Sequence, residues 1–308
     1  MTDTTTITIC VCTFRRPHLA ETLASLARLR LPGGAAVDVV VADNDREPSA
    51  KPVVDAARAG LPFELTYVHA PGANISIARN ACLDAARGRF VAFIDDDEIA
   101  SPDWLAALLA KARETKATAV LGPVHALYEN DAPRWMREGD FHSTFPVWVK
   151  GEIVTGYTCN VLINRAAPDV DALRFDLALG RSGGEDTAFF DRLHKGGGRI
   201  AYAESALLEE GVPPGRARFS WLAKRRFRMG QTHGLLLREA GRGRPAEIAV
   251  ASGKALACVA MSVANLGSPV ELRRNLLRGL LHVGVVGSLL GMQSLVQYGE
   301  TKERPHAA

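Results

Sequence analysis

Residues 88–98, Gly-Arg-Phe-Val-Ala-Phe-Ile-Asp-Asp-Asp-Glu, constrain the fold of this chain more than any other segment. The run from Phe90 to Ile94 is apolar without alternation, which is typical of a strand that helices cover on both faces. Four consecutive acids cannot stay in such a core, so we expect them to emerge at the carboxyl end of the strand. Open α/β sheets bind their ligands at that edge. The alternative interpretation is a solvated acidic loop that follows a strand.

The acidic run also predicts a cation. Carboxylates this close repel one another, and a positive charge among them would relieve the repulsion. Hard carboxylate oxygens suit Mg²⁺ or Mn²⁺, which commonly bridge to phosphates. The segment therefore predicts a site for a metal ion and a diphosphate at the edge of the sheet.

Three further apolar strands precede the acidic one, and helical patterns separate them. We expect strands at 7–13, 37–42 and 65–69, and helices that begin at Pro17, near 52 and at 74. Each strand ends in polar residues at what should be the same edge. The alternating order predicts an α/β fold with a largely parallel central sheet, flanked by helices and connected by right-handed crossovers.

Several separated motifs resemble those of family 2 glycosyltransferases, which have the GT-A fold. They are Cys-Val-Cys-Thr-Phe-Arg-Arg-Pro at 10–17, Val-Val-Val-Ala-Asp-Asn-Asp at 39–45, Ala-Arg-Asn-Ala-Cys-Leu-Asp-Ala-Ala-Arg-Gly at 78–88 and Phe-Ile-Asp-Asp-Asp-Glu at 93–98. Residues 183–193, which begin Gly-Gly-Glu-Asp, are similar to the Glu-Asp motif on the family's acceptor side. The resemblance covers about residues 5–230. It is nearest to bacterial enzymes that build exopolysaccharide repeat units on a lipid carrier.

The resemblance implies a role for individual residues. The donor site would be formed by Thr13, Phe14 and Arg15 in the nucleotide pocket, Asp43 and Asn44 at the uracil ring, Arg79 near the nucleotide, Asp95 at the ribose, and Asp96. Asp97 would be the direct ligand of Mn²⁺ or Mg²⁺. Asp186 would be the general base, and Glu185 would bind the acceptor or orient the base.

The chemistry of sugar transfer calls for the same kinds of residue. A divalent ion stabilises the charge of a leaving diphosphate, and a carboxylate can take the proton of the attacking hydroxyl. One base with in-line attack inverts the anomeric carbon. Gly183 and Gly184 fit a loop whose backbone approaches substrate, before a helix at 187–195. The helix N-terminus would favour the ionised forms of Glu185 and Asp186; plain helix capping is the alternative for this pair.

Other functions fit the sequence less well. There is no Walker A and no Gly-x-Gly-x-x-Gly motif, which argues against ATPases and nicotinamide enzymes. A sugar-nucleotide nucleotidyltransferase would share the sheet and the acidic site but would have a glycine-rich basic loop after the first strand, and residues 13–17 contain no glycine. A non-catalytic nucleotide-sugar-binding scaffold is the other alternative. The Gln-x-x-Arg-Trp motif of processive family members is missing, so single additions are expected.

Length and charge divide the 308 residues, of which 47% are hydrophobic, into a catalytic domain at 1–215 and a basic extension at 216–308. Between 216 and 244 nine Lys or Arg face one acid, a net charge of +8 against +3 for the whole chain. This predicts an anionic partner, and no nucleic-acid-binding motif frames the segment, so nucleic acid is not expected. The five cysteines form no Cys-x-x-Cys pair, and with no secretory leader they suit the cytosol.

The extension contains two apolar stretches, at 248–266 and 279–292. The second is too short for a bilayer core of about 30 Å, and we expect neither to span a membrane. Both predict interfacial or packed helices, the second preceded by Arg273, Arg274 and Arg278. Peripheral contact with the anionic inner face of the plasma membrane, where a lipid-linked acceptor would lie, is one interpretation. A helical cap or a dimer contact is the other.

Overall fold

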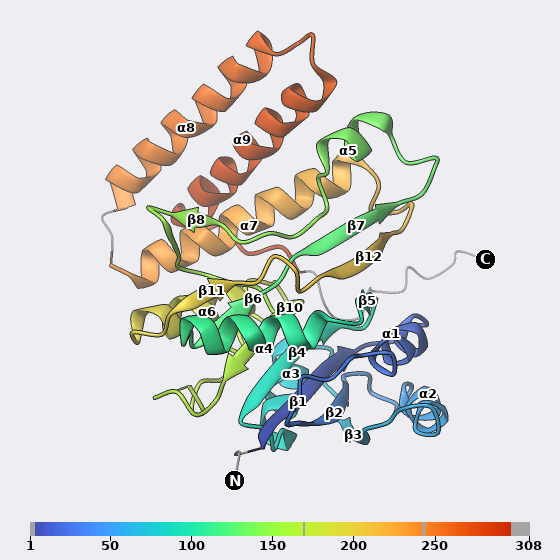
Figure 1. The fold of residues 1–308 in the computed structure, drawn as a ribbon. Helices are drawn as coiled ribbons and strands as arrows, with labels where there is room; N and C mark the ends of the chain where they lie inside the picture. Colours follow the sequence, from blue (N-terminus) through green and yellow to red (C-terminus); the bar gives the residue numbers. More distant parts are fainter. Residues whose placement is uncertain (1–3, 169, 242–243, 297–308) are drawn as a thin grey trace, which may run out of the picture.

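The computed structural model describes residues 4–168, 170–241 and 244–296. Its centre is a nine-stranded sheet in the order β3-β2-β1-β4-β10-β6-β11-β9-β8 (Figure 1). The four strands expected from the sequence lie side by side and parallel: β1 (Thr5–Thr13), β2 (Ala35–Asp43), β3 (Glu64–His69) and β4 (Phe90–Asp95). The carboxyl ends of these strands therefore meet at one edge, as predicted.

Helices cover both faces of this sheet because alternate strand residues point to opposite sides. One face packs Ile9, Val39 and Val41 against α1 (Leu19–Leu26), α2 (Lys51–Ala57) and α4 (Trp104–Thr115). The other face packs Cys10, Val40 and Phe93 against α3 (Ile75–Ala85) and α6 (Glu185–Lys195). Ile7, Ile9, Cys10 and Val11 of β1 are fully buried between the two layers, and so is Thr8.

The remaining strands depart from the parallel arrangement. β10 (Asn160–Asn164) runs antiparallel to both β4 and β6 (Ala119–Leu121), and β11 (Ile200–Tyr202) is again parallel to β6. The edge is a short hairpin of β8 (Trp148–Val149) and β9 (Glu152–Ile153). A separate sheet contains β5 (Glu98–Ala100), β12 (Leu208–Val212) and β7 (Val124–Tyr128), with β12 in the middle. The first strand of this sheet, β5, begins at Glu98, the last residue of the acidic run.

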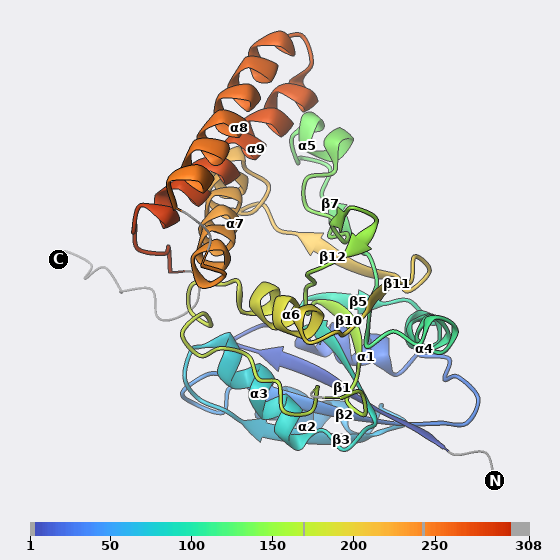
Figure 2. The ribbon, with the colours of Figure 1, turned by 90° about the vertical axis from the view of Figure 1, so that its left-hand side faces the viewer.

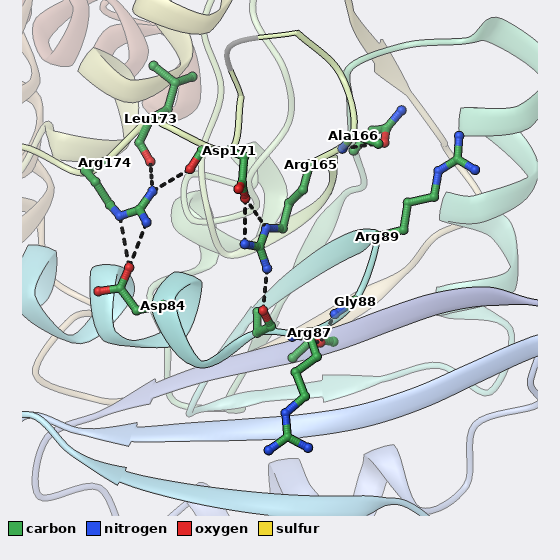
Figure 3. Close-up of polar contacts among 12 residues, drawn as sticks. Asp84, Arg87, Gly88, Arg89, Arg165, Ala166, Asp171, Leu173 and Arg174 are labelled. Atoms are coloured by element: carbon green, nitrogen blue, oxygen red, sulfur yellow. Dashed lines mark hydrogen bonds and ion pairs between the residues drawn. The ribbon is translucent and has the colours of Figure 1, made fainter.

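Near the start of β4, arginines tie the connection after β10 to the C-terminal end of α3 (Figure 3). Arg165 donates to Asp171 at 2.7 Å and to the carbonyl of Ala86 at 2.5 Å. Arg174 bonds Asp84 at 2.8 Å. These contacts fix the start of the long connection that carries the chain across the sheet to α6.

Three C-terminal helices lie together over the three-stranded sheet, away from β1–β3 (Figures 1 and 2). They are α7 (Phe219–Glu239), α8 (Arg244–Ala264) and α9 (Pro269–Leu289). The backbones of α7 and α9 touch at glycines. A Cβ on Gly230 would lie 1.9 Å from the carbonyl of Leu281, and one on Gly284 would lie 2.0 Å from that of Phe227.

Two expectations about the extension need correction. The second apolar helix begins ten residues earlier than expected, at Pro269, because the Ser268 side chain caps it. Arg273 and Arg274 consequently lie inside α9, where their guanidinium groups stack over the rings of Trp135 and Phe141 beside α5 (Arg134–Gly139). Their charges are therefore used partly in packing α9 onto α5.

The prediction that neither stretch could span a membrane is wrong for α8 on length and composition. In the described part of the chain, one segment, Pro245–Ala264, meets that criterion, with a mean hydropathy of 1.5 and few buried residues.

The extension shares a core with the residues before it. Met136 of α5, Val212 of β12, Leu222 of α7 and Leu277 of α9 belong to one buried apolar cluster. The predicted boundary at 215/216 passes through this cluster.

Candidate active site

The acidic run forms a tight turn between β4 and β5 at the carboxyl edge of the sheet. Glu98 Oε2 accepts the backbone N–H of Asp95 at 2.8 Å, which closes the turn. The turn does not simply project into solvent, because β5 returns the chain into the second sheet. Asp96 and Glu98 are therefore buried, at 6% and 1% exposure.

Crowding and burial make these carboxyl groups reluctant to ionise. Burial, with the charge of Asp97 adding to it, raises the pKa of Asp95 to about 6. Burial likewise raises the pKa of Asp96 to about 7, and it raises the pKa of Glu98 well above its usual value. An added cation at this edge would lower the pKa values of all three carboxyl groups, as expected if their charges repel one another.

Two arginines supply positive charge here. Arg16, in the connection after β1, lies 3.7 Å from a carboxylate oxygen of both Asp96 and Asp97. Arg216, after β12, lies 3.4 Å from Asp97 and 2.5 Å from Glu210. Glu210 faces Glu98 across the β12–β5 pairing and joins the acidic cluster. Burial and the charge of Asp97 raise the pKa of Glu210.

The carboxylates fit a divalent cation that is shared with a second anion. Within the described ranges, no group of three or more His, Cys, Asp or Glu side chains is arranged to hold a metal ion alone. Mg²⁺ is often bound by one or two carboxylates together with substrate phosphates and water. Asp97, with Asp95 beside it, offers that smaller set, and diphosphate oxygens would complete the coordination.

Glu185 and Asp186 form the first turn of α6, which begins two residues earlier than expected. Glu185 is buried and ion-paired with Arg79 of α3, with both side chains at most 7% exposed. Asp186 is half-buried, and its Oδ1 accepts the backbone N–H of Thr187 at 2.6 Å. Glu185 Oε2 is buried without a hydrogen-bond partner among the described residues.

Arg79 links this pair to the acidic turn. The charge of Asp186 helps to raise the pKa of Asp95, and the charge of Arg79 opposes this rise. The expected contact of Arg79 with the nucleotide stays a prediction, since its guanidinium faces Glu185 in this structure. The structure thus brings the two ends of the predicted site, 90 residues apart in sequence, around one buried cation.

The two glycines before α6 lie against another part of the chain, and the expected approach of their backbone to substrate stays a prediction. Both have left-handed backbone, with φ of 84° at Gly183 and 95° at Gly184. A Cβ on Gly184 would lie 2.4 Å from the side chain of Thr232 on α7. The close approach is therefore to α7, which places the N-terminus of α6 against the basic helix.

The predicted nucleobase residues lie at the ends of β1 and β2. Asp43 is fully buried, and it accepts the N–H groups of Asp45 and Ala50 and the hydroxyl of Tyr67. Asn44 bonds the carbonyl of Ala70 and the N–H of Asn74 at the cap of α3. Both side chains hold loops in place, and a contact with uracil, which stays a prediction, would have to be made in addition to these bonds.

Residues after β1 are more accessible. Thr13, the last residue of β1, is buried. Arg15 is exposed and has a left-handed φ of 54°. It extends over the ring of Phe14, at 5.3 Å, to Asp45, at 2.8 Å. This places an aromatic ring and a guanidinium beside the carboxyl ends of β1 and β2, where a nucleotide pocket is predicted.

Comparison with known proteins agrees with this geometry. The family model described as "Glycosyl transferase family 2" matches residues 8–169. Succinoglycan biosynthesis protein ExoM of Rhizobium meliloti (strain 1021) is 55% identical over 299 residues, covering 96% of this chain and 97% of ExoM. The chain belongs to glycosyl transferase family 2. The predicted family and the enzyme class, glycosyltransferase, are thereby confirmed.

Solved structures of similar shape confirm the predicted GT-A-type α/β fold of this family 2 member. S. aureus TarS 1–349 in complex with UDP-GlcNAc has a TM-score of 0.53 at 16% identity, covering 96% of this chain and 99% of that one. Mannosyltransferase PcManGT from Pyrobaculum calidifontis, in complex with GDP-Man and Mn²⁺, has a TM-score of 0.63 at 17% identity, covering 92% and 86%. At this identity the likeness concerns the fold alone.

Three residues beside the acids were not predicted from the sequence: Arg16, Glu210 and Arg216. Arg16 lies inside the motif at 10–17, and Arg216 is the first residue of the basic extension, but neither position indicates a contact with the acids. The one signal for Glu210 is an acid within a short strand. Nothing local connects Arg216 to Asp97, 119 residues away.

Proposed function

We propose that this chain is an inverting, metal-dependent glycosyltransferase that adds one sugar from a UDP-sugar to a hydroxyl of a glycan or lipid-linked acceptor. The observation that carries the proposal is the meeting of the acidic β4–β5 turn with Asp186 around the buried Arg79. A metal-diphosphate site and a base then lie in one place. The UDP-GlcNAc bound by TarS supports a UDP-sugar, and the GDP-Man and Mn²⁺ of PcManGT support a metal.

The protein's own groups divide the chemistry. Asp186, at the accessible start of α6, would take the proton from the acceptor hydroxyl as the glycosidic bond forms. Arg79 would pair with Glu185 and hold the first turn of α6 in place. A divalent cation at Asp97 would stabilise the leaving diphosphate as a Lewis acid. With a single base on one side of the sugar, the configuration at the anomeric carbon inverts.

The biological context follows from the relative. Since ExoM is named a succinoglycan biosynthesis protein, we propose that this chain takes part in assembling a similar cell-surface polysaccharide, from the cytoplasmic side.

A screen of donors tests the proposal. UDP-, GDP- and dTDP-sugars are incubated with the full chain, with Mn²⁺, with Mg²⁺ or with a chelator, and the released nucleotide is measured. We expect release from one or more UDP-sugars that depends on the added metal. Release of sugar 1-phosphate in the presence of pyrophosphate would instead indicate a nucleotidyltransferase. Nucleotide binding without turnover on any acceptor would indicate a binding scaffold.

We also propose peripheral contact of the extension with an anionic membrane, with α8 as the main contact. Several of its exposed side chains are large and apolar: Leu256 is 71% exposed, Val263 60% and, just beyond the helix, Leu266 67%. Basic residues of α7 would add attraction of about 1 kcal/mol each near such a surface. A membrane would cover this apolar face. The competing explanations are a dimer contact and a membrane span by α8, which its length and composition allow.

Flotation with liposomes distinguishes these explanations. We expect the chain to float with phosphatidylglycerol liposomes, and to float less at high salt because salt screens the basic residues. Leu256→Asp should lower the affinity for the liposomes roughly 30-fold, since burial of a leucine contributes about 2 kcal/mol. Leu127→Asp, at an equally apolar exposed position on β7, is the control and should float normally. A chain that stays soluble at low salt, and that sediments as a dimer, would favour the dimer contact.

A further inference from the structure

Two arginines share one oxygen of the predicted metal ligand. Asp97 Oδ2 lies 3.7 Å from Nη1 of Arg16 and 3.4 Å from Nη2 of Arg216. The arginines come from the connections after β1 and after β12, so they approach the acidic turn from separate segments. Their side chains are 39% and 25% exposed, which leaves both accessible from the site.

A divalent ion at Asp97 Oδ2 would compete with this arrangement. The ion and the two guanidinium groups carry charge of the same sign, and all three would lie within about 4 Å of one oxygen atom, where repulsion is strong even near a protein surface. An ion that enters without another anion must therefore displace at least one arginine.

A diphosphate removes the conflict. Arginine's planar fork matches phosphate oxygens as well as it matches carboxylates. The contacts to Asp97, at 3.4 and 3.7 Å, are also longer than the usual 2.7–2.9 Å or so of charge-assisted bonds. Asp97 thus binds the two arginines weakly, and phosphate oxygens could replace it as their partner.

The surroundings of Arg216 would allow its guanidinium group to move from Asp97 to a phosphate. It follows Pro213, Pro214 and Gly215 in the short connection between β12 and α7. Its second bond, to Glu210, anchors the guanidinium at the rim of the cluster, and its plane lies 5.9 Å from the ring of Trp221 in the first turn of α7. A change of side-chain rotamer could carry Nη2 away from Asp97 without moving either element.

We propose that Arg16 and Arg216 bind the diphosphate of the donor, and that Asp97 and Glu210 hold them when no donor is present. The metal ion and the nucleotide-sugar would then bind together. The phosphates would bind the two arginines, and this would leave Asp97 to hold the metal. This rests on the proposed function, since it assumes a metal-bound diphosphate donor. It predicts weak binding of the metal alone and an order of binding in which metal affinity depends on the nucleotide.

The test is the Arg216→Met variant, measured by calorimetry with Mn²⁺ alone and with UDP in saturating Mn²⁺. The two affinities should move in opposite directions. Affinity for Mn²⁺ alone should rise several-fold, because a competing cation is gone. Affinity for UDP should fall roughly 10-fold or more, the loss typical of a hydrogen bond to a charged group. A residue with only a structural role would not raise one affinity while lowering the other.

Three further variants sharpen the result. Arg216→Lys keeps the charge but not the fork, so Mn²⁺ affinity should stay low while UDP affinity falls less than in Arg216→Met. If Arg216→Met fails to fold, Arg16→Met replaces it in the test and should show the same two changes in affinity. Arg218→Met, exposed two residues further on, is the control and should change neither affinity.

Each outcome decides between the hypotheses. If Arg216→Met leaves both affinities unchanged, or lowers both, the exchange proposal is wrong. If the native chain binds no UDP with any metal, the proposed function fails first, and the exchange proposal fails with it. If the native chain binds Mn²⁺ alone as tightly as it does with UDP, only the exchange proposal is overturned.

Discussion

The Asp186→Asn variant is expected to transfer sugar about 10²–10⁴-fold more slowly than the native enzyme, because asparagine keeps the shape of the side chain but cannot accept a proton. Asp186 lies in the first turn of α6, and the N–H of Thr187 holds its Oδ1 at 2.6 Å. That bond survives the substitution, so the geometry of the turn should survive as well. Initial rates with a UDP-sugar and its acceptor, and UDP affinity by calorimetry, are the two measurements. The affinity should be nearly unchanged, since a base acts in the transition state.

Two comparisons make this result specific. Asp191→Asn, on the same helix and paired with Lys195 at 2.6 Å, should transfer at the native rate. Glu185→Gln should lower the melting temperature, because it leaves the buried charge of Arg79 without its partner, a change that costs several kcal/mol in comparable pairs, about 3–5. An Asp186→Asn enzyme that transfers at close to the native rate would assign the base to another group.

The Asp97→Asn variant should lose metal-dependent binding of UDP and at least about 10²-fold in transfer rate. Asp97 is the carboxylate on which Arg16 and Arg216 converge, at the carboxyl edge of the parallel strands. An amide oxygen is a much weaker ligand for Mg²⁺ or Mn²⁺ than a carboxylate, so metal and diphosphate would no longer be held together. Calorimetric titration of UDP, with Mn²⁺ and with a chelator, measures the difference.

The control is Asp103→Asn, an exposed acid six residues further on that pairs with Arg30. It should bind UDP with the native affinity and the native dependence on metal. Unchanged UDP affinity in Asp97→Asn, with and without Mn²⁺, would show that Asp97 is not the ligand and would direct attention to Asp95.

The parallel half of the sheet could be predicted from the sequence because its strands are buried on both faces. Burial on both faces requires continuous apolar runs, as in Phe90 to Ile94, and such runs are visible without a structure. The antiparallel part could not be predicted in this way. β6, β8 and β9 have two or three residues each, too few for any period to appear.

The location of the site could also be predicted, but its detail could not. Acids that directly follow a buried strand must lie at the sheet's edge, and this placed Asp95 and Asp97 correctly. The burial of Glu98 and Glu185 depends on segments that are distant in sequence: β12 pairs with β5 at Glu98, and α3 packs Arg79 against Glu185. Asp43 shows the same limit, since a polar residue at a strand end can face a ligand or hold a loop.

The sequence alone determined the family, the parallel strands and the two acidic motifs, because each depends on neighbouring residues in a local pattern. The tertiary structure alone decided which charges face one another. Arg79 meets Glu185 across 106 positions, and Arg216 meets Asp97 across 119. Such pairs leave no local trace, because an arginine on a helix or in a loop looks the same whether it points to water or to a carboxylate. Only the folding of α6 and α7 over the sheet's edge brings those groups within reach.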